Sequence, residues 1–331
     1  MKNLKVVFMG TPTFAVPILE GLIKNTKVLL VVSQPDREKD RKGNILPTPI
    51  KKLAIENNIE VYQPINIKEE YNKIISLNPD IIITCAYGQI IPEIILNNPK
   101  YGCINVHGSL LPKLRGGAPI HHAIINGDKE TGITIMYMDK KMDSGDIISQ
   151  EKIEISANDN LDSLYEKMSH LGAKLLLETL PMIIAGTNER IKQNPEEVTF
   201  GYNITKEEER INFNNSSIDI HNQIRGLSSI PGAYCILDDK RLKVYQSELT
   251  NQKTSLEPGT ITNIDKTGIY VSTKDHIIKF IDIKLEGKKR CLVKDFINGI
   301  KIEEYKGKVL NWWTILLKNG KQTINIKQKL N

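Results

Sequence analysis

The 331-residue sequence contains little cysteine, few aromatic residues and no long hydrophobic run. Its four cysteines form no C-x-x-C pair, so we expect reduced thiols in a cytoplasmic protein rather than a disulfide framework. No apolar stretch approaches the roughly 18 residues that span a bilayer. The N-terminal apolar run, residues 6–9, is also too short for the hydrophobic region of a signal peptide, about 7–15 residues. We therefore expect no membrane association.

Two signatures of cofactor binding are missing as well. Gly10-Thr11-Pro12 follows the first apolar run but lacks the G-x-G-x-x-G spacing of a dinucleotide site. His121 and His122 are adjacent on a predicted helix and face different directions, so they make a poor pair of metal ligands and are expected on the surface. The sequence thus predicts neither a dinucleotide cofactor nor a metal.

The charge is distributed unevenly along the chain. Residues 1–200 contain 23 Lys and Arg against 24 Asp and Glu, a net charge of −1. Residues 201–331 contain 22 against 15, a net charge of +7. This imbalance favours a near-neutral catalytic domain followed by a domain that binds a polyanion, although a solvated lysine-rich surface would give the same balance.

The first half of the sequence alternates short apolar runs with helical patterns. Continuous apolar runs of this kind are typical of parallel strands covered on both faces, which predicts a doubly wound α/β fold. Helices are expected at residues 14–23 and 160–185, the second capped by Asp159 or Asn160. The expected strands are residues 4–9, 28–32, 80–84, 102–107 and 133–138.

The remaining segments define the domain organisation. The polar, proline-containing residues 33–49 predict a long exposed loop, a kind of segment that is often functional. The charged residues 188–208 are interpreted as a linker between a catalytic domain, 1–187, and a second domain, 209–331. Short strand patterns separated by turns predict a small, OB-like β-barrel in the second domain. These strands are residues 233–237, 241–245, 259–264, 268–272 and 276–283, with turns at 238–239 and 266–268.

Candidate catalytic residues follow the strand at 102–107. Asn105 and His107 are two residues apart, so their side chains share one face of the strand. An amide donor beside an imidazole suits a carbonyl that becomes a tetrahedral oxyanion. Asp143, in a turn after the strand at 133–138, would complete the set by bringing a carboxylate to His107. Each residue alone has an ordinary structural explanation, since Asp favours turns and most histidines at strand ends are only hydrogen-bonded.

The surrounding motif resembles a known family. Asn-x-His-x-Ser-Leu-Leu-Pro-x-x-Arg-Gly-x-x-Pro at 105–119, with Gly-Asp-x-x-Thr-Gly-x-Thr at 127–134 and Asp-x-Gly-Asp at 143–146, is similar to the formyltetrahydrofolate-dependent formyltransferases. The similarity covers about residues 4–310 and is greatest to members that act on methionyl-tRNA. Further matching segments are residues 10–15, 34–37, 86–89 and 258–260.

The resemblance implies a Rossmann-like formyltransferase domain, 10-formyltetrahydrofolate as donor and the α-amino group of methionyl-initiator-tRNA as acceptor. We separately expect a monomer. Asn105, His107 and Asp143 fall on the family's catalytic positions. The implied folate-binding residues are Ser109, Leu110, Leu111, Pro112, Gln89, Ile90 and Ile91, with the last three and the loop 138–143 contributing mainly backbone atoms.

The resemblance also implies how tRNA is bound. Residues 33–49 correspond to an inserted loop that meets the acceptor stem, with Arg41 on its key basic position beside Arg37 and Lys42. In the second domain it is the basic charge, not the resemblance, from which we expect tRNA contacts at Lys288, Lys289 and Arg290, together with Lys240, Arg241 and Lys243. A solvated hairpin turn would also explain the run at 288–290.

Two other functions share these features. A folate-dependent formyltransferase acting on an amino-sugar nucleotide or on glycinamide ribonucleotide would use the same site, but the basic loop and the positive second domain favour tRNA. A non-catalytic RNA-binding protein on an inactive scaffold is the third interpretation, and the complete set of Asn105, His107 and Asp143 argues against it.

Overall fold

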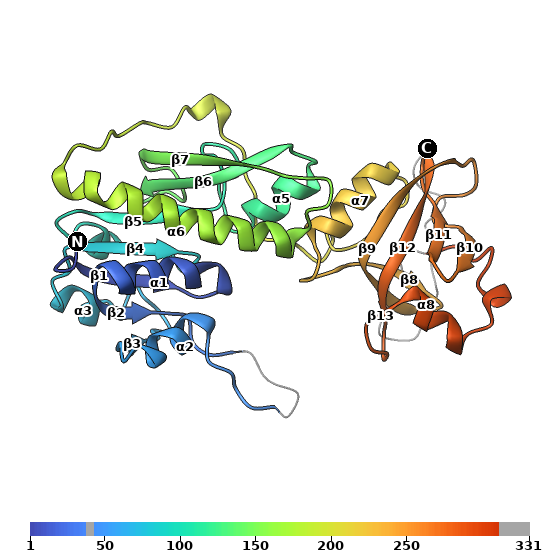
Figure 1. Cartoon of the computed structure of the whole chain (residues 1–331), viewed down its shortest axis with the longest axis horizontal. Helices are drawn as coiled ribbons and strands as arrows, with labels where there is room; N and C mark the ends of the chain where they lie inside the picture. The colour runs from blue at the N-terminus through green and yellow to red at the C-terminus, as the bar shows by residue number, and fades with distance from the viewer. Residues whose placement is uncertain (38–42, 311–331) are drawn as a thin grey trace. The chain divides into compact units, whose positions relative to one another are not determined.

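The computed structural model describes residues 1–37 and 43–310 (Figure 1). The chain forms two compact units, the first from Met1 to Ile204 and the second beginning at Thr205. Each unit contains its own sheet.

The first unit is built on a mixed seven-stranded sheet with the order β3-β2-β1-β4-β5-β6-β7. The five strands from β3 to β5 are parallel neighbours, whereas β6 pairs antiparallel with both β5 and β7. The predicted doubly wound α/β class is confirmed, with an antiparallel edge that the sequence did not reveal. The strands are β1 (Lys5–Gly10), β2 (Lys27–Val32), β3 (Val61–Tyr62), β4 (Ile81–Cys85), β5 (Cys103–His107), β6 (Glu130–Tyr137) and β7 (Ile147–Glu154).

Apolar side chains cover both faces of this sheet. Val6 and Phe8 of β1 pack in a core with the long helix α6, and Val7 and Met9 lie in a second core on the opposite face. This alternation follows from the period of two in a strand. The α-helices of the unit are α1 (Val16–Asn25), α2 (Pro49–Glu56), α3 (Asn72–Ser76), α4 (Glu93–Leu96), α5 (Pro119–Ile125) and α6 (Leu161–Ala185), with short 3₁₀ turns η1 (Thr13–Ala15) and η2 (Pro195–Glu197).

The strand order reverses between β1 and β4, because the chain first adds β2 and β3 on one side and then β4 and β5 on the other. Open α/β sheets bind ligands in the crevice beyond the carboxyl ends of the strands at such a switch point. The topology therefore places the ligand site at the ends of β1, β4 and β5.

The segment after α6 folds back onto the first unit. Ile191 forms an isolated bridge with Ile147 at the start of β7, and Phe200 forms one with Arg115. The boundary between the units thus falls after Ile204, near the end of the segment 188–208 expected to be a linker, and the first part of that segment belongs to the first unit.

The second unit contains an antiparallel sheet with the order β10-β11-β12-β9-β8, and β13 pairs with β12. Among residues 205–310 no ladder joins β8 to β10, so the expected small barrel is open at this seam. Asp238 and Asp239 have φ of 48° and 61°, as a two-residue hairpin turn between β8 and β9 requires. The elements are α7 (Ser217–Gly226), β8 (Ala233–Leu237), β9 (Lys240–Lys253), β10 (Ile261–Asp265), β11 (Gly268–Ser272), β12 (His276–Leu285), β13 (Cys291–Leu292), α8 (Val293–Phe296), η3 (Ile297–Gly299) and η4 (Ile302–Glu304).

None of the helices within residues 1–37 and 43–310 combines the length and the hydrophobicity that a bilayer crossing demands.

Candidate active site

A cavity of about 570 Å³ opens at the carboxyl ends of β1, β4 and β5 in the first unit. A volume of this size lies within the usual range for small-molecule sites, about 300–1,000 Å³. Its walls come from the segments that follow these strands and from the start of α5. The lining residues include Pro12, Phe14, Thr84, residues 86–91, 105–108 and 116–121, Met136, residues 138–143, Tyr165 and Asn203.

Asn105 projects into this cavity from β5, between β4 and β6. The hydroxyl of the buried Thr84 on β4 donates a 2.9 Å hydrogen bond to Asn105 Oδ1. This bond occupies the amide oxygen and fixes the orientation of the side chain. Asn105 Nδ2 is then the group of the amide that can donate a hydrogen bond to a ligand.

His107 lies two residues further along β5 and is only 5% exposed. Its Nε2 is 3.1 Å from the carbonyl oxygen of Leu114. Because a carbonyl only accepts hydrogen bonds, Nε2 must carry a hydrogen, which fixes the neutral tautomer and leaves Nδ1 as the unprotonated nitrogen. The reactive edge of the imidazole is therefore Nδ1.

Asp143 faces this edge. Its Oδ1 is 3.7 Å from His107 Nδ1, and its Oδ2 accepts a 2.8 Å hydrogen bond from the backbone N–H of Gly116. The structure therefore brings Asn105, His107 and Asp143 to one cavity, as the sequence predicts. The 3.7 Å separation is longer than a direct hydrogen bond but close enough for the carboxylate to stabilise a charged imidazolium.

Strained backbone surrounds these side chains. Ala86, Leu114 and Asp143 adopt φ of 49°, 56° and 49°, the left-handed region that residues other than glycine rarely occupy. Such conformations persist where the surrounding contacts over-determine them, and they cluster at functional sites. Ala86 and Asp143 line the cavity, and Leu114 supplies the carbonyl that orients His107.

Of the residues implied to bind folate, Gln89, Ile90 and Ile91 line the cavity. The side chain of Gln89 is engaged elsewhere, because its Oε1 accepts a 2.9 Å hydrogen bond from the backbone N–H of Ile67. Gln89 can therefore offer the cavity its backbone, in line with the backbone role expected for this segment.

The structure does not bring residues 109–112 to this cavity. Ser109 and Leu110 line a separate hollow of about 190 Å³, and Leu111 and Pro112 line neither. Hydrogen bonds fix the segment to the antiparallel edge of the sheet: Thr134 Oγ1 on β6 donates to the Ser109 carbonyl at 2.6 Å, and Gln150 Nε2 on β7 donates to the Leu111 carbonyl at 2.9 Å.

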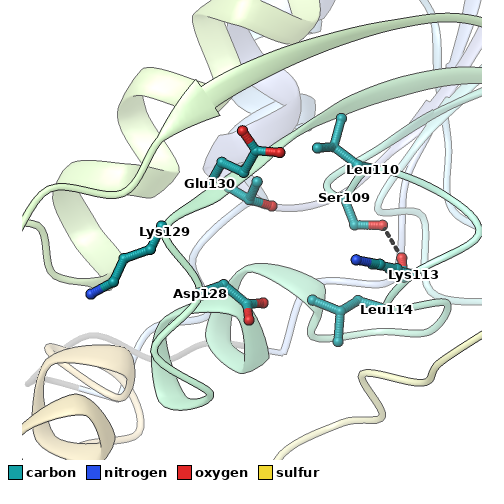
Figure 2. Close-up of a pocket in the computed structure, with 8 residues that line it drawn as sticks. Ser109, Leu110, Lys113, Leu114, Asp128, Lys129 and Glu130 are labelled. Atoms are coloured by element: carbon teal, nitrogen blue, oxygen red, sulfur yellow. Dashed lines mark hydrogen bonds between the residues drawn. The ribbon is translucent and has the colours of Figure 1, made fainter. Parts of the chain in front are cut away.

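Figure 2 shows this smaller hollow. The Ser109 hydroxyl donates a 2.6 Å hydrogen bond to the Lys113 carbonyl beside Leu110 and Leu114, and the side chain of Lys129 extends away from the hollow. The Ser109 hydroxyl thus stabilises the turn that leads to Leu114, whose carbonyl orients His107.

The structure describes only part of the basic loop. Arg37 is exposed, and Arg41 and Lys42 lie outside the described residues. Asp36 anchors the base of the loop: burial alone would raise its pKa, but hydrogen bonds from the side chains of Lys51 and Gln63 and from the Thr48 backbone lower it overall.

In the second unit, Lys288 and Lys289 are exposed after β12. Arg290 is engaged within the unit, because its guanidinium forms 2.9 and 2.7 Å hydrogen bonds to Asp282 and lies 4.0 Å from the centroid of the Tyr245 ring. Its guanidinium is therefore less available to a ligand than the ammonium groups of the two exposed lysines.

Other residues at the site carry no local sequence signal. Thr84 orients Asn105, and Asn203 reaches the cavity from the segment after α6. His121, expected on the surface, is half-buried and also lines the cavity. Tyr165 on α6 also lines the cavity, and burial raises its pKa to about 12.

Within the described residues, no three His, Cys, Asp or Glu side chains cluster closely enough to hold a metal ion.

The sequence matches two family models, one described as formyl transferase over residues 3–180 and the other as formyl transferase, C-terminal domain, over residues 203–301. The chain belongs to the formyl transferase family. This formyl transferase is 50% identical over 298 residues to the methionyl-tRNA formyltransferase of Staphylococcus aureus strain MW2, which covers 89% of the chain and 96% of that relative.

Solved structures have the same fold at lower identity. A sugar 3N-formyl transferase crystallised with dTDP and 5-N-formyl-THF has a TM-score of 0.62 at 24% identity, covering 87% of this chain and 100% of the other. An N-formyltransferase from Helicobacter canadensis, in complex with folinic acid and dTDP-3-aminofucose, has a TM-score of 0.61 at 24% identity, covering 85% and 99% of the two chains. These likenesses establish the fold of the formyl transferase.

Proposed function

We propose that this formyl transferase moves the formyl group of 10-formyltetrahydrofolate to the α-amino group of methionyl-initiator-tRNA and so produces N-formylmethionyl-tRNA for translation initiation. The observation that carries the proposal is the 50% identity, across both domains, to a methionyl-tRNA formyltransferase. The cavity with Asn105, His107 and Asp143 supplies the chemistry.

The reaction begins when the neutral amine of the aminoacyl ester attacks the formyl carbon. A carbon–nitrogen bond forms, and negative charge develops on the formyl oxygen. Asn105 Nδ2 donates a hydrogen bond to this oxygen, held in place by Thr84. Because the hydrogen bond is directed at the oxyanion, it lowers the barrier more than it strengthens substrate binding.

Proton transfer follows through His107. Its Nδ1 accepts a proton from the attacking nitrogen, and the carboxylate of Asp143, 3.7 Å away, stabilises the imidazolium. The proton then passes to N10 of the folate as the bond between N10 and the formyl carbon breaks. Tetrahydrofolate and the formylated amine leave, and His107 returns to its neutral state.

We assign the folate to the wall formed by Gln89, Ile90 and Ile91 and by the loop 138–143. Residues 109–112 support this site indirectly, because their hydrogen bonds to β6 and β7 anchor the turn that ends at Leu114. The carbonyl of Leu114 then orients His107.

We assign the tRNA to two basic regions. In the second unit, Arg241, Lys243 and Tyr245 lie on one face of β9, where Arg241 is exposed and the other two are half-buried, while Leu242 and Val244 between them are buried. A face that combines basic and aromatic side chains suits the phosphates and bases of a nucleic acid. Lys240, Lys284, Lys288 and Lys289 add to this charge, and Arg37, Arg41 and Lys42 form the basic loop of the first unit. We further propose that the enzyme works as a monomer in the cytoplasm.

The test is a formylation assay with the purified full chain and 10-formyltetrahydrofolate. Methionyl-initiator-tRNA, an amino-sugar nucleotide and glycinamide ribonucleotide are offered as acceptors in parallel. We expect formyl transfer to the charged tRNA at a kcat/KM at least about 10³ higher than to either small acceptor, because only the tRNA engages the basic regions. Preferential formylation of a small acceptor would assign a different substrate, and no transfer to any acceptor would reject the enzymatic proposal.

A further inference from the structure

The side-chain amide of Gln193 forms four hydrogen bonds at the edge of the active site. Its Oε1 accepts hydrogen bonds from Arg115 Nε at 3.0 Å and Arg115 Nη2 at 2.7 Å. Its Nε2 donates to the carbonyl oxygens of Asp143 at 2.9 Å and Gly145 at 2.8 Å. A side chain with both acceptor sites and both donor hydrogens engaged holds one orientation.

These bonds close a circuit around the catalytic carboxylate. Gln193 forms hydrogen bonds with the backbone carbonyl of Asp143 and with the side chain of Arg115. Gly116, the residue after Arg115, donates its N–H to Asp143 Oδ2 at 2.8 Å. Asp143 is therefore fixed both through its main chain and through its carboxylate. This explains how the residue keeps its φ of 49°.

The same segment also supports His107. Thr199 Oγ1 accepts a 2.9 Å hydrogen bond from the N–H of Leu114, and the Thr199 carbonyl accepts one of 2.9 Å from the N–H of Arg115. The carbonyl of Leu114 is the group that orients the imidazole. Residues 193–199 were expected from the sequence to be part of a linker. They hydrogen-bond to the backbone of Asp143 and to that of Leu114, whose carbonyl orients His107.

We propose that Gln193 is a positioning residue that sets Asp143 against Nδ1 of His107, and that the segment after α6 thereby belongs to the catalytic apparatus. The inference rests on the proposed function for the role of Asp143, and it adds a residue that does not itself line the cavity. Loss of the two bonds from Nε2 would release the Asp143 backbone, change its distance to His107 and slow proton transfer.

Gln193→Glu separates positioning from stability. The substitution keeps the size of the side chain and the acceptor for Arg115, but it removes both donated hydrogen bonds and sets a carboxylate against the Asp143 and Gly145 carbonyls. Asn194→Asp is the matched control: it makes the same amide-to-carboxylate change one residue away, at an exposed position whose Oδ1 only accepts from the Glu196 N–H.

The full chain with each substitution is assayed for kcat, for both KM values and for the pH dependence of kcat. We expect Gln193→Glu to lower kcat about 10- to 100-fold and to shift the pH profile, since displacements of about 1 Å cost this much. Both KM values and the unfolding temperature should stay close to wild type, and Asn194→Asp should change none of these quantities. An unchanged kcat, or a loss confined to KM, would overturn the proposal.

Two further measurements separate this inference from the proposed function. If Gln193 acts through Asp143, adding Gln193→Glu to Asp143→Asn should lower kcat no further, whereas multiplied losses would show an independent role. The imidazole of His107 can also be titrated by NMR without any substrate, with His107→Ala identifying its signals. A titration shifted by Gln193→Glu but not by Asn194→Asp supports the positioning role even if the acceptor is not methionyl-tRNA, and an unshifted titration contradicts it.

Discussion

Asn105 is the residue on which the proposed chemistry most directly depends. Removing one preorganised oxyanion donor usually costs about 10²–10³ in kcat. We therefore expect Asn105→Ala to lose about this factor in steady-state formylation, while the Kd for folate measured by calorimetry stays roughly unchanged. A kcat within about threefold of wild type would remove Asn105 from the mechanism.

Thr84 offers a second test of the same hydrogen bond. Thr84→Val keeps the shape of the buried side chain but removes the hydroxyl that donates to Asn105 Oδ1. The amide is then free to rotate, so we expect kcat to fall about 10-fold with little change in KM, on the order of one lost hydrogen bond. Thr84→Ser keeps the hydroxyl and serves as the control. Equal losses in the two variants would point to packing rather than to orientation of the amide.

Part of the candidate catalytic set was predictable at this scale, because Asn105 and His107 are only two residues apart. Asn105 and His107 share a strand face by the period of two, and Asp143 follows the neighbouring strand β6. Thr84 and Gln193 were not predictable. Each forms its hydrogen bond with a residue that is 21 or more positions away, and no short motif encodes such a contact.

At the scale of elements, α6 shows how local chemistry defines a helix. Asn160 and Ser163 form a reciprocal capping box at its start, so Asn160 is the cap of the two residues that the sequence offered. Asp159 adds to it by accepting hydrogen bonds from Ser163 Oγ, Lys167 Nζ and the Ser156 N–H. Burial opposes ionisation of Asp159, but these bonds outweigh it and lower its pKa to about 2.

This pKa predicts a pH-dependent effect of Asp159→Asn. Because the pKa of Asp159 is lower in the folded protein than the ordinary 3.8, its contribution to stability is present above about pH 4 and is lost as the pH falls towards 2. We expect the variant to lower the free energy of unfolding by about 2 kcal/mol at pH 7, measured by urea denaturation, and by progressively less below pH 4. Asp162→Asn, at an exposed position in the first turn, is the control. A constant difference between pH 7 and pH 2.5 would contradict the assignment.

Some elements were harder to predict from the sequence than α6. The strand β7 has the sequence IISQEKIE, whose last six residues are mostly polar or charged and alternate between half-buried and exposed, because one face of this edge strand is exposed. It therefore differs from the continuous apolar runs of the buried strands β1 and β4. The strand β3 contains two residues, too few for any periodicity.

At the scale of the whole molecule, the proposed tRNA complex predicts a strong dependence on salt. Phosphate contacts release counterions, so log Kd for methionyl-tRNA should rise steeply and linearly with log salt concentration. Replacing both Lys288 and Lys289 by Ala should reduce the slope by about two, roughly one per lost contact. The control replaces Lys152 and Lys174, which pair with Glu130 and Glu151 on the first unit. A flat salt response would reject the polyanion interpretation.

The basic excess of the C-terminal part is itself distributed unevenly. Residues 311–331 contain four lysines and no acidic residue, so of the net charge of +7 carried by residues 201–331 only +3 belongs to residues 201–310. The described sheet face is therefore basic by the local arrangement of Arg241, Lys243 and their neighbours rather than by a large net charge.

The sequence by itself determined the α/β class, the limits of α6, the hairpins of the second unit and the shared strand face of Asn105 and His107, because periodicity, caps, turns and strand spacing act over a few residues. Tertiary structure decided the antiparallel edge of β6 and β7, the packing of residues 188–204 on the first unit and the circuit from Gln193 to Asp143. These features depend on hydrogen bonds between segments distant in the chain. Their partners are chosen only when the folded sheet brings the segments together.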